Sequence, residues 1–401
     1  MFIRLAWRSL LNRKGSVALT FLAISVSVFV LLGIEHIRQQ AKFSFNNTVS
    51  GVDLIVGART GDINLLLYSA FRLGSATNNV TWESYQEIAQ KPKVAWTIPI
   101  SLGDSHKGYR VMGTTIDYFK HFRYGQKKPL EFTDGEAFSE VFDVVLGAVV
   151  ARKLNYQLND ELVLAHGIAS TSFILHDETP FRVVGILKPT GTPVDYTLHV
   201  SLSGIEAIHS DLALHDVTPK NITAFMLGLH SKMATFHMQR EINNYRAEPL
   251  SAILPGVTLT QLWQMMTIME NTLILVSALV LLASLLGLSA MLLASIRERQ
   301  REIAIMRSLG APPLFVFMLI QTEALLITLA SSAFALLLLF VSLLCFQNFL
   351  ADNFSLSIST YVLDKNILYL LLSIIISALV ISLIPAISAY STALQKTLNN
   401  V

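Results

Sequence analysis

The chain has few charged residues and a single cysteine. Lys, Arg, Asp and Glu make up 14% of its 401 residues, whereas soluble domains carry about 25%. Cys345 lies in an apolar run, so an intrachain disulfide and a Cys-x-x-Cys metal or redox site are both excluded. Hydrophobic residues account for 52% of the chain and are concentrated in blocks. This pattern indicates an integral membrane protein.

The sequence motifs of common catalytic sites are also missing. The chain contains no G-x-x-x-x-G-K-[ST], no G-x-S-x-G, no H-E-x-x-H and no paired Cys/His zinc spacing. It therefore has no P-loop, and we expect neither catalytic residues nor a cofactor bound by this chain. The net charge of +2 gives no sign of a nucleic-acid partner, and the expected surroundings are membrane lipid.

Four apolar runs are each long enough to cross a hydrocarbon core of ~30 Å. The sequence predicts spans over residues 16–34, 272–296, 314–346 and 366–390. No A-x-A cleavage pattern follows the first run, which favours an uncleaved span over a signal peptide. Residues 1–15 form an amphipathic segment that we expect along the inner surface. Pro385 predicts a kink or an end point in the last span.

The positively charged residues predict the orientation. Arg and Lys gather before the first span and between the second and third, in residues 297–313, whereas residues 347–365 carry one Lys and two Asp. Both termini, including the tail 391–401, are therefore expected in the cytoplasm. The long segment between the first two spans is expected outside.

That segment contains the outer domain, which we place at residues 49–257. Short runs rich in β-branched and aromatic residues alternate with helical patterns, without a regular βαβ period, so the expected fold class is α+β. Thr81 is the expected N-cap of a helix over 82–90. The length allows two subdomains, with a boundary at 125–135. The predicted strands are 94–101, 109–114, 141–149, 161–165, 172–176, 181–188, 196–202 and 222–229.

Two helical stalks are expected to join the outer domain to the membrane. Residues 35–48 continue the first span outward, and residues 258–271 lead into the second span, so that stalk and span together cover 258–296. Ordinary stalk packing is favoured over metal binding for the apolar face of the second stalk. That face includes Leu262, Met265, Met266 and Met269.

Residues 297–311 form a basic, amphipathic stretch between the second and third spans. Gly310 is a typical residue after a helix C-terminus, and Pro312-Pro313 prevents the helix from continuing. A short helix there would lie at the membrane surface and move both spans when pressed. A positively charged loop that only fixes topology explains the same pattern. Glu323 lies about two turns into the third span, where a carboxylate is costly and suggests function.

The outer domain is rich in histidine, but no ligand motif supports a metal site. His209 and His215 are six residues apart, and Asp216 is adjacent to His215. These three residues are the candidates for a metal site, although surface histidines without a metal are the favoured interpretation.

One span, a large outer domain, three further spans and the stretch R-E-I-A-I-M-R-S-L-G-A, followed by Q-x-E, resemble the MacB/FtsX-type ABC transporter permeases of the type VII, mechanotransmission family. The stretch 51–61, GVDLIVGARTG, also resembles the start of outer domains in that family. The resemblance implies that residues 297–313 are the coupling helix that docks on the ATPase, and that Glu323 is the family's acidic residue in the third span. The corresponding coupling-helix positions are Arg299, Arg301, Glu302, Ile303, Ile305, Arg307, Leu309 and Gly310.

The resemblance also implies the partners and the location. The ATPase, which would bind ATP and Mg²⁺, is expected to be a separate cytoplasmic subunit, because the chain opens with a span and has no fused nucleotide-binding domain. A second permease copy, as a homodimer, or a paralogous permease would complete the complex, with a possible periplasmic accessory protein. The expected location is the inner membrane of a Gram-negative bacterium.

Three functions remain open at this point. The first is export or extrusion of substrate from the periplasmic side or the outer leaflet. The second is a role in a zinc-linked ABC system, because residues 98–119 resemble a permease subgroup associated with such systems. The third is a regulatory permease that activates an envelope enzyme.

Overall fold

A computed structural model of the chain describes residues 2–167, 179–209, 218–298, 303, 305–306, 308, 310–354, 359 and 361–398. Its contacts divide the chain into two compact units. The helical unit comprises Met1–Gln40, Thr267–Asn348 and Ile358–Val401, and the domain unit comprises Ala41–Met266 and Phe349–Ser357. The helices α2, α9 and α11 each continue from one unit into the other.

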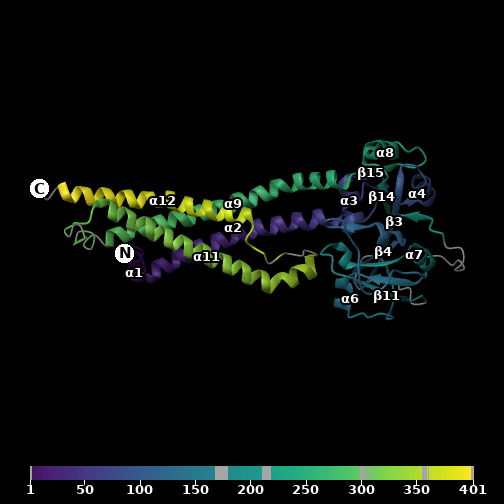
Figure 1. Ribbon diagram of the computed structural model, residues 1–401, viewed down its shortest axis with the longest axis horizontal. Coiled ribbons are helices and arrows are strands. Elements are labelled where there is room, and N and C mark those ends of the chain that lie inside the picture. The colour runs from purple at the N-terminus through teal and green to yellow at the C-terminus, as the bar shows by residue number, and fades with distance from the viewer. Residues whose placement is uncertain are drawn as a thin grey trace. The chain divides into compact units, whose positions relative to one another are not determined.

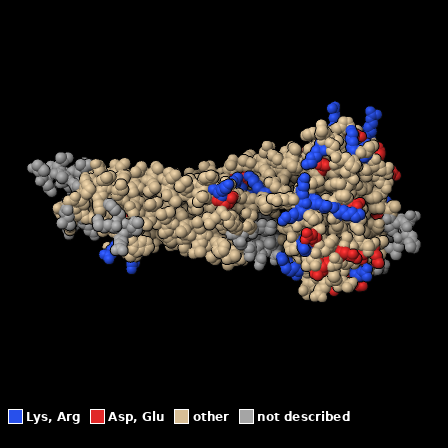
Figure 2. Space-filling view, in the orientation of Figure 1, with Lys and Arg blue, Asp and Glu red and all other residues tan. Residues whose placement is uncertain are grey.

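The helical unit contains the apolar runs. Four of the described helices are long and apolar enough to cross a membrane, over Lys14–Thr48, Pro255–Glu298, Pro313–Phe346 and Lys365–Ser391. On the face that Figure 2 shows, these helices carry few charged side chains apart from one group of basic and acidic residues. The helices in full are α1 (Phe2–Leu11), α2 (Lys14–Thr48), α9 (Pro255–Glu298), α11 (Pro313–Phe354) and α12 (Lys365–Leu398), drawn in Figure 1.

Each long helix buries one stripe of side chains and leaves apolar side chains on its other faces. In α9 the buried stripe follows intervals of three and four residues, whereas Leu275, Leu279 and Leu282 are exposed. A helix that is apolar all round is typical of a lipid environment, in which the outward residues meet acyl chains. The buried stripe of α9 consists of Leu281, Leu285, Leu288, Leu292 and Ile296.

Two helices run further than the sequence suggested. α11 continues to Phe354, beyond the predicted span. α12 continues through Pro385 to Leu398, so Pro385 is not an end point. Proline removes one backbone donor from a helix interior, and such a residue is tolerated in spans where neighbouring groups satisfy the freed carbonyl.

The domain unit is built on a mixed sheet of eleven strands, in the path β15-β1-β14-β3-β4-β12-β8-β11-β7, with β10 beside β3 and β9 beside β11. Most pairs are antiparallel, but β12 runs parallel to β4 and β11 runs parallel to β8. The strands of this sheet are β1 (Leu54–Ala58), β3 (Val94–His106), β4 (Tyr109–Thr114), β7 (Phe132–Gly135), β8 (Asp143–Leu146), β9 (Glu161–Leu162), β10 (Ala165–His166), β11 (Phe181–Leu187), β12 (Thr197–Ser201), β14 (Ala224–Leu229) and β15 (Leu250–Ile253).

Shorter elements surround the sheet. Two small two-stranded sheets pair β13 with β2 and β5 with β6. These strands are β2 (Val80–Thr81), β5 (Arg123–Tyr124), β6 (Lys128–Pro129) and β13 (Asn221–Ile222). The helices are α3 (Asp62–Phe71), α4 (Trp82–Ala89), α5 (Asp117–His121), α6 (Ala148–Leu154), α7 (Leu202–Ile208) and α8 (Thr235–Asn243), with 3₁₀ turns η1 (Pro193–Tyr196) and η2 (Lys232–Ala234).

β3 holds the two ends of the sheet together. Its first half pairs with β14 and its second half with β4, so one continuous sheet runs through the domain unit. Three buried apolar clusters pack on the sheet. The predicted fold class, an α+β domain inserted between the first and second of four apolar helices, is confirmed. The predicted strand 172–176 lies outside the described residues.

Candidate functional site

The helices α2 and α9 are tied together at the end that adjoins the basic stretch. Arg13, immediately before α2, donates from Nη2 to the backbone oxygen of Ser295 at 2.9 Å. Its Nε also lies 3.6 Å from a carboxylate oxygen of Glu298, the last residue of α9. Residues 297 and 298 are the end of α9, so the basic stretch continues directly from the part of the helix that Arg13 holds to the start of α2.

Two serines join the same helices near their midpoints. The hydroxyl oxygens of Ser27 and Ser284 are 2.7 Å apart, and the Ser284 hydroxyl also reaches the backbone oxygen of Ala23 at 3.4 Å. Small side chains allow the helix backbones to approach closely, and hydroxyl bonds between membrane helices contribute about 0.6–2 kcal/mol each. This contact fixes the register of α2 against α9.

A third contact joins α2 and α9 beyond the serines. Arg38 donates to both carboxylate oxygens of Glu35, at 2.7 Å and 3.0 Å, and its Nη1 lies 3.5 Å from Glu270 in α9. Gln39 donates to Glu35 at 2.7 Å. The side chains of Glu35 and Glu270 are both largely buried. Charge-assisted bonds of this kind resist separation more strongly than exposed ion pairs.

The spacing of these contacts matches the thickness of a membrane. Arg13 and Arg38 are separated by about 38 Å of helix at ~1.5 Å per residue. The hydrocarbon core is ~30 Å thick, so both charged contacts fall near its two boundaries and the serine contact falls within it. The pair α2–α9 is therefore joined at both boundaries and in the middle, an arrangement suited to moving as one body.

Glu323 is buried in the helical unit. The residue is 2% exposed, on the inward stripe of α11 together with Ala324 and Ile327. Two residues earlier, on a different face of α11, the amide oxygen of Gln321 accepts a hydrogen bond from the hydroxyl of Ser382 in α12 at 2.9 Å. Gln321 thus contacts α12, and Glu323 is buried among protein atoms rather than exposed to lipid.

The structure describes only part of the basic stretch. Gly310 has φ +92°. The backbone nitrogen of the next residue, Ala311, donates a hydrogen bond to the backbone oxygen of Met306 at 3.1 Å. This left-handed conformation after a helical turn is the one expected for a glycine at a helix C-terminus. Ile305 is exposed and Ile303 is intermediate in burial. The remaining candidates lie outside the described residues, namely Arg299, Arg301, Glu302, Arg307 and Leu309.

The stalk segments meet through aromatic residues. In the domain unit, Trp263 of α9 contacts Phe45 of α2, with ring centroids 5.5 Å apart, and the Lys42 ammonium lies 5.4 Å from the Trp263 ring. Met265 and Met269 are exposed, whereas Leu262 and Met266 are half-buried. The Met-rich face is therefore only partly covered within this one chain.

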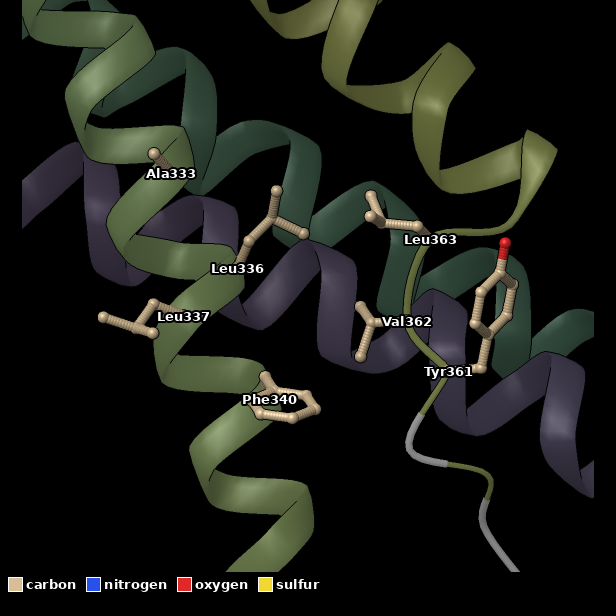
Figure 3. A pocket seen from close by; sticks show the side chains of 7 residues that line it. All are labelled: Ala333, Leu336, Leu337, Phe340, Tyr361, Val362 and Leu363. Carbon is tan, nitrogen blue, oxygen red and sulfur yellow. The ribbon is translucent and has the colours of Figure 1, made fainter.

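The helical unit also contains an apolar pocket of about 430 Å³ beside α11 (Figure 3). The segment before α12 forms its second wall, and the Tyr361 hydroxyl is the one side-chain polar group among the labelled residues in this view. The size suits an acyl chain or an apolar side chain. The lining residues are Ala333, Leu336, Leu337, Phe340, Tyr361, Val362 and Leu363.

In the domain unit, His209 lies beside two residues that the sequence did not bring together with it. Its Nε2 is 3.4 Å from Oδ1 of Asp104 and 3.0 Å from Nδ1 of His166. The hydrogen bond to the Asp104 carboxylate raises the pKa of His209 above its ordinary value. His215 and Asp216 lie outside the described residues. Asp104 was missed because no motif spacing connects it with either histidine.

Two family models match the chain. The model described as MacB-like periplasmic core domain matches residues 17–243, and the model described as FtsX-like permease C-terminal matches residues 274–394. Together they cover the first span, the α+β domain and the last three spans. The first match alone includes more than half of the chain.

Curated relatives agree with these matches. The chain is 24% identical over 330 residues to the macrolide export ATP-binding/permease protein MacB of Wolinella succinogenes, covering 77% of this chain and 48% of that protein. It is 22% identical over 351 residues to the pyoverdine export ATP-binding/permease protein PvdT of Pseudomonas savastanoi pv. phaseolicola, covering 81% and 49%. The chain thus spans about half the length of the curated relatives it matches.

A solved structure also aligns with the chain. The periplasmic region of MacB from Actinobacillus actinomycetemcomitans aligns with 53% of this chain and 94% of that structure, at 11% identity and a TM-score of 0.36.

Proposed function

Because this chain belongs to the family of permeases with a MacB-like periplasmic core domain and an FtsX-like C-terminal region, we propose that it couples ATP hydrolysis by a separate cytoplasmic ATPase to movement of its α+β domain. In this proposal the ATPase docks on residues 297–313, and the domain acts on substrate at the outer face of the membrane. The orientation follows from the positive charges of the N-terminal flank and the basic stretch.

The observation that carries the proposal is the joining of α2 and α9. The inner contact, through Arg13, lies next to the proposed docking stretch, and the outer contact, through Arg38 and Glu270, lies within the two stalk segments, at their membrane ends. A push on residues 297–313 would therefore reach the far ends of both helices without a change within either helix. Gln321 would hold α11 to α12 through its hydrogen bond with Ser382.

The likeness to export proteins favours extrusion as the activity. MacB and PvdT are named for macrolide export and pyoverdine export. We infer an export or extrusion role, with substrate taken from the periplasmic side or the outer leaflet of an inner membrane. Two copies of the permease would place two domain units around one substrate, and the exposed Met265 and Met269 are available for contact between copies.

Docking is tested by co-purification of the chain with the ATPase that its operon or genome supplies. Gly310→Ala and Gly287→Ala form a matched pair, because a Cβ at either position meets nothing within 4 Å, but only Gly310 has a left-handed φ. We expect Gly310→Ala to lower ATPase recovery severalfold, since alanine disfavours this conformation by about 1–2 kcal/mol. Gly287→Ala should retain full recovery.

The two possible failures are distinguishable. Equal ATPase recovery with both variants would contradict docking at residues 297–313. Failure of the wild-type chain to recover any ATPase would contradict the coupling proposal as a whole. Membrane insertion of both variants, measured by the yield of detergent-extracted protein, serves as the control.

A further inference from the structure

Three side chains from separate elements of the domain unit converge on one point. Asp104 lies on β3, His166 lies on β10, and His209 follows α7. Asp104 and His166 are direct partners across the antiparallel β3–β10 pair, which places both side chains on the same face. His209 adds an imidazole from a segment more than forty residues further along the chain. The fold, rather than local sequence, brings these groups together.

The three facing atoms form a nearly equilateral triangle. Nδ1 of His166 is 3.2 Å from Oδ1 of Asp104 and 3.0 Å from Nε2 of His209, and Nε2 of His209 is 3.4 Å from the same Asp104 oxygen. In a tetrahedral site with bonds of about 2.0–2.1 Å, neighbouring ligand atoms are ~3.3–3.4 Å apart. An ion about 2.05 Å from all three atoms would lie ~0.9 Å out of their plane.

The imidazole of His209 is oriented for coordination. Its Nδ1 faces the backbone oxygen of Ile205 at 2.8 Å, so this nitrogen carries the hydrogen and donates to the carbonyl. The remaining nitrogen, Nε2, then presents its lone pair to the triangle when the ring is neutral. A backbone carbonyl that fixes the tautomer of a histidine is the usual outer-shell partner of a metal ligand.

The exposure of the three residues leaves a position open to solvent. The Asp104 side chain is 2% exposed, whereas the His209 side chain is 32% and the His166 side chain 56% exposed. A buried carboxylate therefore forms the floor of the site and two accessible imidazoles form its sides. A fourth ligand, water or a group from another molecule, can approach from the solvent side.

Without an ion, the two imidazole nitrogens cannot face each other as lone pairs at 3.0 Å. A hydrogen on Nδ1 of His166 resolves the conflict, because it is donated toward Asp104 and His209. Coordination requires that hydrogen to leave Nδ1, either as a released proton or by transfer to Nε2 of the same ring through solvent. The competing description of the cluster is a histidine–aspartate ion pair with no affinity for metal.

The geometry points to a divalent transition-metal site formed by Asp104, His166 and His209, with Zn²⁺ as the ion of best fit. Two imidazoles and one carboxylate suit Zn²⁺, whereas Mg²⁺ and Ca²⁺ require mainly oxygen ligands. The ion would join β10 and the end of α7 to β3 within the domain unit. This proposal does not depend on coupling to an ATPase, so the two can fail separately.

The test uses the full chain in detergent, carrying no polyhistidine tag and stripped with a chelator. Zn²⁺ is titrated against a competing indicator, and bound metal is counted by mass spectrometry after gel filtration. We expect one Zn²⁺ per chain. Because loss of an outer-shell partner already weakens metal sites 10–100-fold, removal of a direct ligand by His166→Ala or His209→Ala should weaken binding by at least about tenfold.

Two further variants separate binding from folding and from stray histidines. Asp104→Asn preserves the shape of the buried residue, and His237→Ala removes an exposed histidine of the same domain that lies outside the cluster. Asp104→Asn should weaken Zn²⁺ binding, and His237→Ala should leave the affinity unchanged. Co²⁺ in place of Zn²⁺ should give the visible absorption of a four-coordinate ion, lost in His209→Ala.

Three results would overturn the proposal. The first is a wild-type chain that binds no stoichiometric Zn²⁺. The second is unchanged binding in both His166→Ala and His209→Ala. The third is an equal loss of affinity in His237→Ala, which would mean general surface binding. The thermal unfolding midpoint of each metal-free variant shows whether a loss of Zn²⁺ binding comes instead from a misfolded domain. If another variant is misfolded, the result for His166→Ala decides, because His166 is the most exposed of the three residues and its replacement disturbs the fold least.

Discussion

Acidification should open the domain unit by protonating one buried histidine, His199. This residue lies on β12 and is completely buried. Its Nδ1 faces the backbone oxygen of Val145 at 3.3 Å, and among the described residues its Nε2 has no hydrogen-bond partner. Burial, together with the nearby positive charge of Arg72, lowers the pKa of His199 to about 3. The folded domain therefore holds this imidazole neutral.

The direction of the effect follows from the depressed pKa. An unfolded histidine takes up a proton near pH 6.5, but His199 in the folded domain does so only near pH 3. The stability that depends on the neutral ring is complete above pH 6.5 and is lost progressively between pH 6.5 and 3. Between pH 7.5 and 5.0 the loss is about 2 kcal/mol, or ~30-fold in the opening equilibrium, at ~1.4 kcal/mol per pKa unit.

Hydrogen exchange in the full chain measures this opening. Protection of the backbone amides of β12 and β8, corrected for the intrinsic pH dependence of exchange, reports the free energy of opening the sheet. The matched variant is His199→Gln, which keeps an amide donor and carries no charge at either pH. The variant should lose most of the pH dependence, whatever its stability at pH 7.5.

The comparison with the variant removes the contributions of other groups. Burial lowers the pKa of His106 and adds to the acid sensitivity, whereas the Asp104 carboxylate raises the pKa of His209, which acts in the opposite direction. Both groups are present in the wild type and in His199→Gln. An equal pH 7.5 to pH 5.0 ratio of protection in the two proteins would refute the assignment to His199.

Two further predictions concern the helical unit. Arg38→Gln and Glu270→Gln should each lower ATP-driven activity of the co-purified complex. Because both variants remove the same contact, the loss of stability in the double variant should be smaller than the sum of the two single losses by about 1 kcal/mol. Additive losses in thermal unfolding would contradict a shared contact. Glu323→Gln removes the carboxyl group at a 2% exposed position but keeps the side-chain volume. It should leave ATPase recovery unchanged and slow substrate-stimulated hydrolysis, and an unaltered rate would exclude a role for the carboxyl group in coupling.

Features set by local sequence could be predicted. Thr81 was expected to cap the helix that follows, and its side chain accepts from the Ser84 nitrogen. The four apolar helices followed from the length of uncharged runs, and the α+β class followed from short strand patterns without a βαβ period. In each case the determining residues are neighbours in the chain, so propensity and capping chemistry decide the outcome.

Features set by distant residues could not be predicted. Arg38 meets Glu270 and Asp104 meets His166 and His209 only because the helices pair and the sheet closes. β10 is two residues long, and the predicted strand 161–165 includes only the first of them and ends before His166. One sequence feature indicates the contact between α2 and α9. Arg38 and Glu270 each lie just outside an apolar run, at positions where opposite charges on neighbouring spans can pair.

Movement of the stalks during the ATP cycle is the most direct test of the coupling account. Cys345 is the only cysteine, so a Cys345→Ala, Met269→Cys chain carries one label per copy at an exposed stalk position. Spin–spin distances between two copies are then measured in the complex with its ATPase, with ATP and a hydrolysis-deficient ATPase, and with ADP. The account predicts a shift of the distance distribution between the two states. The same distribution in both states, with a labelled chain that supports ATP hydrolysis by the wild-type ATPase, would contradict it.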